Sequence, residues 1–222
     1  MDYCLQQMIK SWKKADPPPD RVKPVPVTVL RCIHIIAFSE QDTVQHALAD
    51  MITIAFFFLL RPGKYTSSTS ETTPFTLHDV QFFIGDRRLK TATAPLVDIE
   101  LAIFATLTFT TQKNGVRGEV VGLSCSQDSI LCPVQELACR VIHLRLHNAP
   151  PTTPLATDFR QGTLHKILPS HISTALRMAV THLGLVLGFT AADIFARCLR
   201  ASGANALLCA DVDGDIIRLL GR

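Results

Sequence analysis

The stretch FARCLRASGA (residues 195–204), with the run DGDIIRLLGR (residues 213–222), decides how the end of the chain folds. Its apolar spacing predicts two helices, at about 196–209 and 213–220, joined by a turn at 211–214. Arg197 and Arg200 are three residues apart, so they share a helix face or the start of the helix. An arginine placed at the head of a helix can present its guanidinium to a phosphate.

The rest of the chain divides into helices, then strands, then helices again. The apolar spacing upstream predicts two helices, at 27–39 and 42–60, the second of which is stopped by Pro62 and Gly63. The middle predicts three strands, at 79–84, 103–111 and 118–124, and the last two are joined by a hairpin containing Asn-Gly. Beyond them we expect helices at 132–147 and 169–187 and a short strand at 164–168. This order predicts an α+β fold, mostly helical with a small antiparallel β-sheet.

A proline-rich segment separates a short N-terminal piece from the rest. Residues 3–14 predict a short helix, which prolines from position 17 onward break. We therefore expect residues 1–21 to form an N-terminal helix and a Pro-rich linker, which are either the tail end of a larger domain or a docking helix. We expect residues 22–222 to form the main domain.

Composition narrows the class of protein. The chain has 222 residues, 47% of them hydrophobic and 18% charged, which is typical of a globular protein. The net charge of +3 permits a nucleic-acid partner without requiring one. The seven cysteines show no CxxC spacing, so we expect buried thiols in a reducing compartment and no metal site. The longest apolar run is too short to cross a bilayer, so we expect a soluble intracellular protein, nuclear or cytoplasmic, with no membrane partner.

Basic residues stand at several of the predicted breaks. Arg61 follows a Phe-rich helix, Lys113 lies at the tip of the hairpin, and Arg197 and Arg200 start a late helix. Each has an ordinary explanation when taken singly, such as a cation at a helix end or a solvated turn. Their order along the chain is more specific than any one of them.

That order resembles the catalytic domain of the tyrosine recombinases, the phage-integrase type, and most of all the versions carried by eukaryotic mobile elements. The residues that carry the likeness are the segments DPP (16–18), AFFFLLRPG (55–63) and LRASGA (199–204). The resemblance extends over about 22–222. It implies a fold that wraps double-stranded DNA, a homo-oligomer assembled on that DNA, and a phosphotyrosine reaction that needs no metal or other cofactor.

The resemblance also implies roles for individual residues. Arg61 and Arg200 would clamp the scissile phosphate, and Lys113 would donate a proton to the leaving oxygen. Arg197 stands where the family usually has a histidine, so it can bind phosphate but cannot serve as a base. Lys64 stands where an acidic residue is usual.

The nucleophile of the family has no match in this sequence. The family places its tyrosine on a further helix, whereas this sequence stops at Arg222, and neither Tyr3 nor Tyr65 falls at that position. We therefore expect a DNA-binding, recombinase-like (integrase) domain from DNA recombination or integration that is inactive as an enzyme. We also expect an uncovered apolar groove beside Ile216, Leu219 and Leu220.

Two other interpretations remain open. The chain could be a non-enzymatic helical interaction module whose basic residues keep it soluble, or a decayed open reading frame of a mobile element. The arrangement of the four basic residues in space separates these interpretations. Arg61, Lys113, Arg197 and Arg200 gathered on one concave face favour DNA binding, and scattered ones favour the interaction module.

Overall fold

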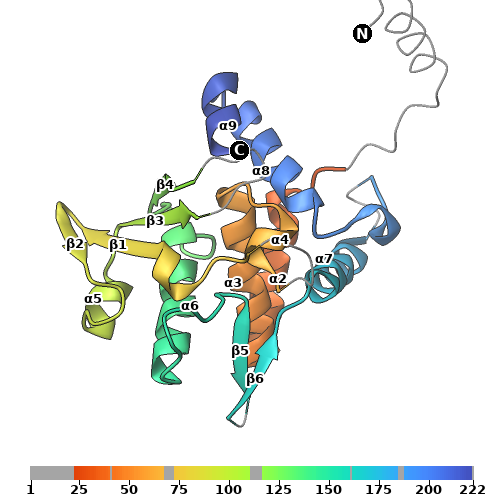
Figure 1. Ribbon diagram of the computed structural model, residues 1–222. Coiled ribbons are helices and arrows are strands. Elements are labelled where there is room, and N and C mark those ends of the chain that lie inside the picture. Colours follow the sequence, from red (N-terminus) through yellow and green to blue (C-terminus); the bar gives the residue numbers. More distant parts are fainter. Residues whose placement is uncertain are drawn as a thin grey trace, which may run out of the picture.

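The computed structural model describes residues 23–40, 42–67, 73–110, 117–160, 162–184 and 188–221. Within them, helices at both ends of the chain flank a small antiparallel sheet, which Figure 1 shows at the side of the helices. The α+β fold expected from the sequence is therefore confirmed. The predicted N-terminal helix and linker, at 1–21, lie outside the described residues.

The helices are α2 (Val27–Glu40), α3 (Thr43–Phe57), α4 (Pro62–Tyr65), α5 (Leu96–Glu100), α6 (Pro133–Leu146), α7 (Pro169–Leu183), α8 (Cys198–Cys209) and α9 (Gly214–Leu220). Two 3-10 turns are η1 (Leu77–Asp79) and η3 (Ala191–Asp193). The strands are β1 (Val80–Ile84), β2 (Arg87–Leu89), β3 (Phe104–Phe109), β4 (Glu119–Ser124), β5 (Thr157–Arg160) and β6 (Thr163–Lys166).

The larger sheet has the order β2-β1-β3-β4, and every pair in it is antiparallel. The strands expected at 79–84, 103–111 and 118–124 are confirmed as β1, β3 and β4. Alternate residues, such as Val80, Phe82 and Leu107, are buried, so one face of the sheet packs on the core and on α6. The short strand β2 and the strand β5, which pairs with β6, were not predicted.

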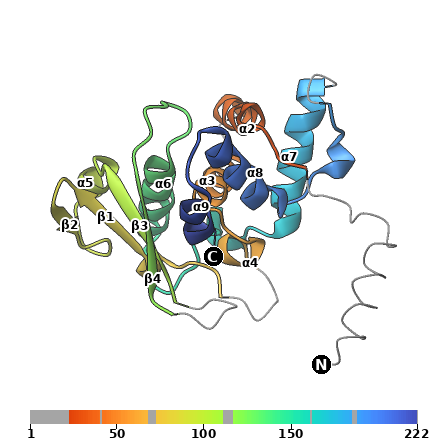
Figure 2. The same cartoon turned by 90° about the horizontal axis from the view of Figure 1, so that it is seen from above.

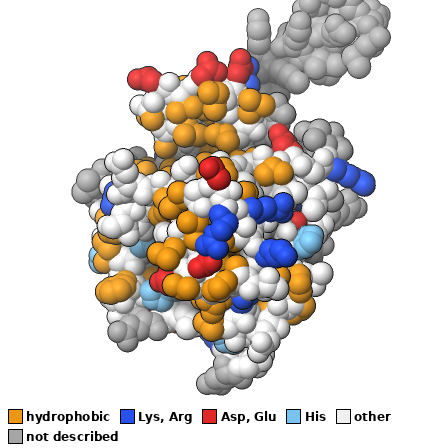
Figure 3. Space-filling model, turned by 90° about the vertical axis from the view of Figure 1, so that its left-hand side faces the viewer, with side chains coloured by type: hydrophobic (Ala, Val, Ile, Leu, Met, Phe, Trp, Pro, Cys, Tyr) orange, Lys and Arg blue, Asp and Glu red, His pale blue; other side chains and the backbone are white. Residues whose placement is uncertain are grey.

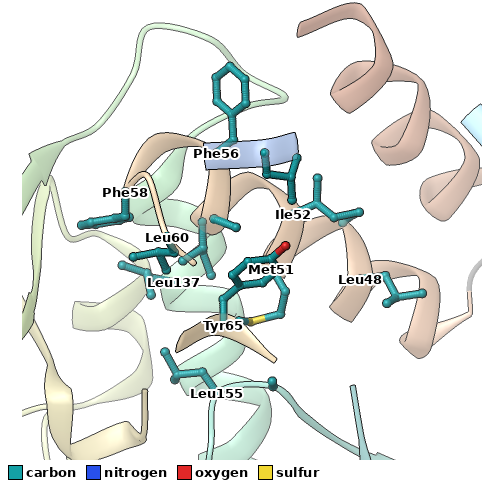
Figure 4. Packing of buried hydrophobic residues seen from close by; sticks show 14 of the residues in the cluster. Leu48, Met51, Ile52, Phe56, Phe58, Leu60, Tyr65, Leu137 and Leu155 are labelled. Carbon is teal, nitrogen blue, oxygen red and sulfur yellow. The ribbon is translucent and has the colours of Figure 1, made fainter. Parts of the chain in front are cut away.

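Helix α3 forms the centre of the core. Every residue from Ala47 to Phe56 is buried, because α2, α6, α7 and α8 all pack against this helix. Figure 2 shows α3 enclosed by these neighbours, and Figure 4 shows Met51 and Phe56 among the apolar side chains around it. Asp50 and Thr53 are the polar residues inside this otherwise apolar stretch.

The end of α3 differs from the prediction. The sequence predicts a helix as far as Leu60, but the helix ends at Phe57 because Leu59 takes a left-handed conformation with φ 51°. The Leu60 N–H then bonds back to the Ala55 carbonyl at 2.9 Å, which closes a Schellman turn. A non-glycine residue in this conformation costs about 1–2 kcal/mol, which the burial of the Leu59 side chain offsets.

Two helix boundaries near the C-terminus also differ. Helix α7 ends at Leu183 rather than at 187, because Gly184 (φ 69°, ψ −156°) takes a backbone conformation that is essentially restricted to glycine. The helix expected from about 196 begins at Cys198, after the 3-10 turn that Thr190 caps. Among the described helices, none has both the length and the apolar character to cross a membrane.

Candidate functional site

At the candidate site, α8 closely contacts the end of α3. A Cβ atom on Gly203 would lie 2.1 Å from the Phe56 carbonyl oxygen and 2.5 Å from a Leu59 methyl group. Only glycine allows this approach. Ser202 fixes the helix further, because its Oγ accepts a hydrogen bond from the Val25 N–H at 2.6 Å. The N-terminal half of α8 is therefore held beside the turn that leaves α3.

Arg61 and Arg200 meet at this junction. Arg61 stands exposed before α4, in extended backbone, and Arg200 lies partly buried in the first turn of α8. Burial lowers the pKa of Arg200, and the positive charge of Arg61 lowers that pKa further. Neither guanidinium forms an ion pair with any carboxylate in the described residues. The positive charge of Arg61 thus acts on Arg200, and within the described residues no ion pair neutralises either side chain.

Arg197 occupies a different position at the head of α8. It is exposed, and its guanidinium carbon lies 5.0 Å from the centre of the Phe195 ring. The guanidinium carbon of Arg177 lies 4.7 Å from the same ring, and its Nε donates to the Ile194 carbonyl at 2.9 Å. Phe195 therefore holds two cations by cation–π contact. Arg197 is one of these two cations. Its charge is not among the causes that shift the pKa of Arg200.

The other predicted site residue, Lys113, lies outside the described residues, as does Tyr3. The structure thus brings Arg61 and Arg200 together and places Arg197 at the same end of α8. Among the described residues, no group of three or more His, Cys, Asp or Glu side chains is arranged to hold a metal ion.

Tyr65 has a role that the sequence analysis missed. Its side chain is 0% exposed, and its hydroxyl donates a hydrogen bond to the Ala196 carbonyl at 2.8 Å. Burial raises the pKa of Tyr65, so the phenol stays neutral at physiological pH. The bond ties α4, which follows Arg61, to the segment that leads into Arg197. The only available signal was the closeness of Tyr65 to Arg61 in the sequence.

Lys64 adds a further cation near this tether. Its Nζ donates to the Thr73 carbonyl at 3.1 Å and lies 5.8 Å from the centre of the Phe75 ring. Burial lowers the pKa of Lys64, and the carboxylate of Asp79 opposes that shift. Lys64 is therefore held against the protein surface rather than extended toward a ligand.

A buried polar cluster also lies between α3 and α6. Burial, a hydrogen bond to Asp50 and the negative charge of Asp50 together raise the pKa of Glu136 to about 11. Arg140 lies 3.9 Å from Asp50 and donates to the backbone carbonyl oxygens of Leu155 and Thr157. This cluster joins α6 to α3 and to the backbone at Leu155 and Thr157.

The C-terminal helices carry exposed apolar side chains. Ile216 and Leu219 on α9 are 49% and 47% exposed, and Leu208 on α8 is exposed as well. Apolar side chains gather over these helices at the top of Figure 3, with acidic groups at the rim. Ile216 and Leu219 are therefore exposed as expected, but the expectation was wrong for Leu220, which packs against the core.

Comparison with known proteins adds no assignment to this geometry. The chain matches no model of a known protein family, and no curated protein matches it significantly.

Proposed function

We propose that this chain is a double-stranded-DNA-binding domain of tyrosine-recombinase type, in which Arg61 and Arg200 clamp one backbone phosphate. The observation that carries the proposal is the pair of guanidiniums at the junction of α3, α4 and α8, which no carboxylate of the described residues pairs with. A shared phosphate would remove their mutual repulsion and accept charge-assisted hydrogen bonds from both.

The surroundings of the pair support a binding role. The contact at Gly203 and the hydrogen bond of Tyr65 hold the two arginine-bearing segments together, although they are far apart in the sequence. A preformed pair loses less conformational entropy when it binds its ligand. Arg197 adds a third cation at the head of α8. Contacts to phosphate carry no sequence information, so the binding we propose is largely non-specific and sensitive to salt.

We propose binding without strand exchange. Within the described residues the one tyrosine is Tyr65, and its buried, hydrogen-bonded hydroxyl cannot reach a phosphate. An arginine, which is what position 197 holds, cannot act as a base. We expect no covalent protein–DNA adduct on a nicked suicide substrate, judged by a denaturing gel. A shifted band that survives denaturation would contradict this.

A non-enzymatic interaction module is the second candidate, and the exposed apolar side chains of Ile216 and Leu219 favour it. The two candidates differ in what the arginines do. In the module, Arg61 and Arg200 only solubilise the surface, and replacing them leaves DNA affinity unchanged. In the DNA-binding domain they supply most of that affinity.

Fluorescence anisotropy with a labelled duplex at low salt tests the proposal. Two charge-assisted contacts contribute about 1.5–3 kcal/mol each. Arg61→Ala combined with Arg200→Ala should therefore weaken binding by about 100-fold or more. The control is Arg87→Ala, which removes an exposed cation that pairs with Asp98 at 3.0 Å. Its affinity should stay within about twofold of the wild type. Equal affinity of the double variant and the wild type would overturn the proposal.

The same variants separate binding from folding. Because Arg61 repels Arg200, Arg61→Ala should leave the melting temperature unchanged or raise it, while it weakens DNA binding. A loss of DNA affinity accompanied by an equal loss of stability would show that Arg61 is a structural residue.

A further inference from the structure

A second basic site lies beside the sheet. A cavity of about 570 Å³ is lined by η1, β1, β2, β3, the loop after β2 and the end of α6. None of its lining residues belongs to α4, which follows Arg61, or to α8, which carries Arg200. Figure 3 views the molecule from the sheet side and shows basic side chains gathered among apolar ones. The volume is within the range of small-molecule sites.

Arg145 lines the inner part of this cavity from the last turn of α6. Its Nη1 donates to the Ala94 carbonyl at 2.6 Å and to the Thr91 carbonyl at 3.2 Å. A guanidinium has five N–H donors, so those on Nε and Nη2 remain. Within the described residues they have no protein partner, and Arg145 pairs with no carboxylate. The side chain is thus fixed in place with donors left over.

Arg88 and Lys90 line the outer part of the cavity. The Nε of Arg88 donates to the Gln81 side-chain oxygen at 2.7 Å, and the Gln81 amide nitrogen in turn donates to the Leu89 carbonyl. This chain of bonds holds the guanidinium of Arg88 beside the cavity. Lys90 is exposed and lies directly after β2. Among the described residues neither cation pairs with a carboxylate, in contrast to Arg87, which pairs with Asp98 and does not line the cavity.

The acid at this cavity is already engaged. Asp79 is the carboxylate among the lining residues, all of which are described, and it is only 5% exposed. Its Oδ2 accepts hydrogen bonds from the N–H and the hydroxyl of Thr76, at 2.8 and 2.9 Å. The cavity therefore holds three cations and one buried carboxylate, which within the described residues forms no ion pair with any of them. Cations in a hollow with low-dielectric walls concentrate anions there.

We propose that this cavity binds a small organic phosphate, with the phosphate held by Arg88, Lys90 and Arg145. Arginine is suited to phosphate because its planar fork can donate two parallel hydrogen bonds. Apolar groups of Leu77 and Pro151 line the cavity as well, so the ligand carries an apolar body on its phosphate. This site is independent of the proposed DNA contact at Arg61 and Arg200.

Phenyl phosphate is a suitable probe because it joins a phosphate to an apolar ring. Backbone amide chemical shifts are followed as phenyl phosphate, inorganic phosphate or phenol is added at constant ionic strength, which keeps screening equal. We expect saturable shifts for phenyl phosphate with a Kd of about 1 mM or below, centred on residues 90–92 and Arg145. Inorganic phosphate should bind several-fold more weakly, and phenol should not saturate.

Variants locate the binding. Arg88→Gln combined with Lys90→Gln should weaken phenyl phosphate binding at least about tenfold, whereas the neighbouring Arg87→Gln should change it less than about twofold. Both altered side chains are exposed, so the fold is retained, and the unchanged amide spectrum verifies this. The proposal is overturned if phenyl phosphate shows no saturable shifts. It is equally overturned if Arg87→Gln weakens binding as much as the double variant, or if the shifts cluster at Arg61 and Arg200.

Discussion

Replacing Glu136 by glutamine should change how stability depends on pH. Glu136 lies buried on α6 and hydrogen-bonds Asp50 on α3. Burial first, then the bond to Asp50 and its negative charge, raise the pKa of Glu136 from 4.5 to about 11. In the folded protein this carboxyl therefore keeps its proton at neutral pH, whereas in the unfolded chain it loses the proton above its ordinary pKa.

The sign and size of the effect follow from proton linkage. The folded state binds a proton that the unfolded state releases, so the contribution of Glu136 to stability is full below pH 4.5 and falls as pH rises toward 11. Each pH unit in this window lowers the free energy of unfolding by about 1.4 kcal/mol. Between about pH 5 and about pH 8 the loss is about 4 kcal/mol. Glutamine needs no proton and can donate its amide N–H to Asp50.

Urea denaturation at both pH values measures this difference. Because the other titrating groups are common to both proteins, the stability of Glu136→Gln relative to the wild type isolates the contribution of this site. We expect the variant to gain about 4 kcal/mol on the wild type between about pH 5 and about pH 8. Glu100→Gln, at an exposed position on α5, should show no such gain. A stability difference that is equal at both pH values would refute the reasoning.

Three other outcomes are expected. Gly203→Ala should lower the free energy of unfolding by about 1–3 kcal/mol in urea, because its Cβ would overlap backbone, whereas Gly214→Ala meets nothing within 4 Å and should not destabilise; equal effects would contradict the packing described. Tyr65→Phe should cost about 1 kcal/mol by the same measurement, since it leaves a buried carbonyl without its donor, and an unchanged stability would show that the bond is not formed. A hydrophobic dye should bind the folded protein, and Ile216→Ser with Leu219→Ser should weaken its fluorescence; equal fluorescence would place the dye elsewhere.

Much of the fold could be predicted because its signals are local. The helices α2, α3, α6 and α9 show apolar periodicity, and Asp213 accepts backbone hydrogen bonds at the start of α9. The end of α3 could not be predicted, because the left-handed Leu59 depends on its burial against residues distant in the sequence. The strand β2 is too short, at three residues, to give a pattern. Its partner β1 is what holds it in place.

The candidate site could be predicted from the sequence only in part. Basic residues at breaks are common, so pattern alone could not pair Arg61 with Arg200, and the resemblance to recombinases suggested it. The tether through Tyr65 is a contact between distant segments, which composition does not encode. Asp50 did leave a signal, because a charged residue inside an apolar helix needs a buried partner. The identity of that partner, Glu136, required the packing of α3 on α6.

The salt dependence of DNA binding tests the central claim most directly. The affinity for a labelled duplex is measured by anisotropy over a series of salt concentrations, for the wild type and for Arg61→Ala combined with Arg200→Ala. Each lost phosphate contact lowers the slope of log affinity against log salt by about 0.9. If both arginines contact one phosphate, the slope of the double variant should be shallower by about 1. Identical slopes and affinities for the two proteins would contradict the claim that these arginines form a phosphate clamp.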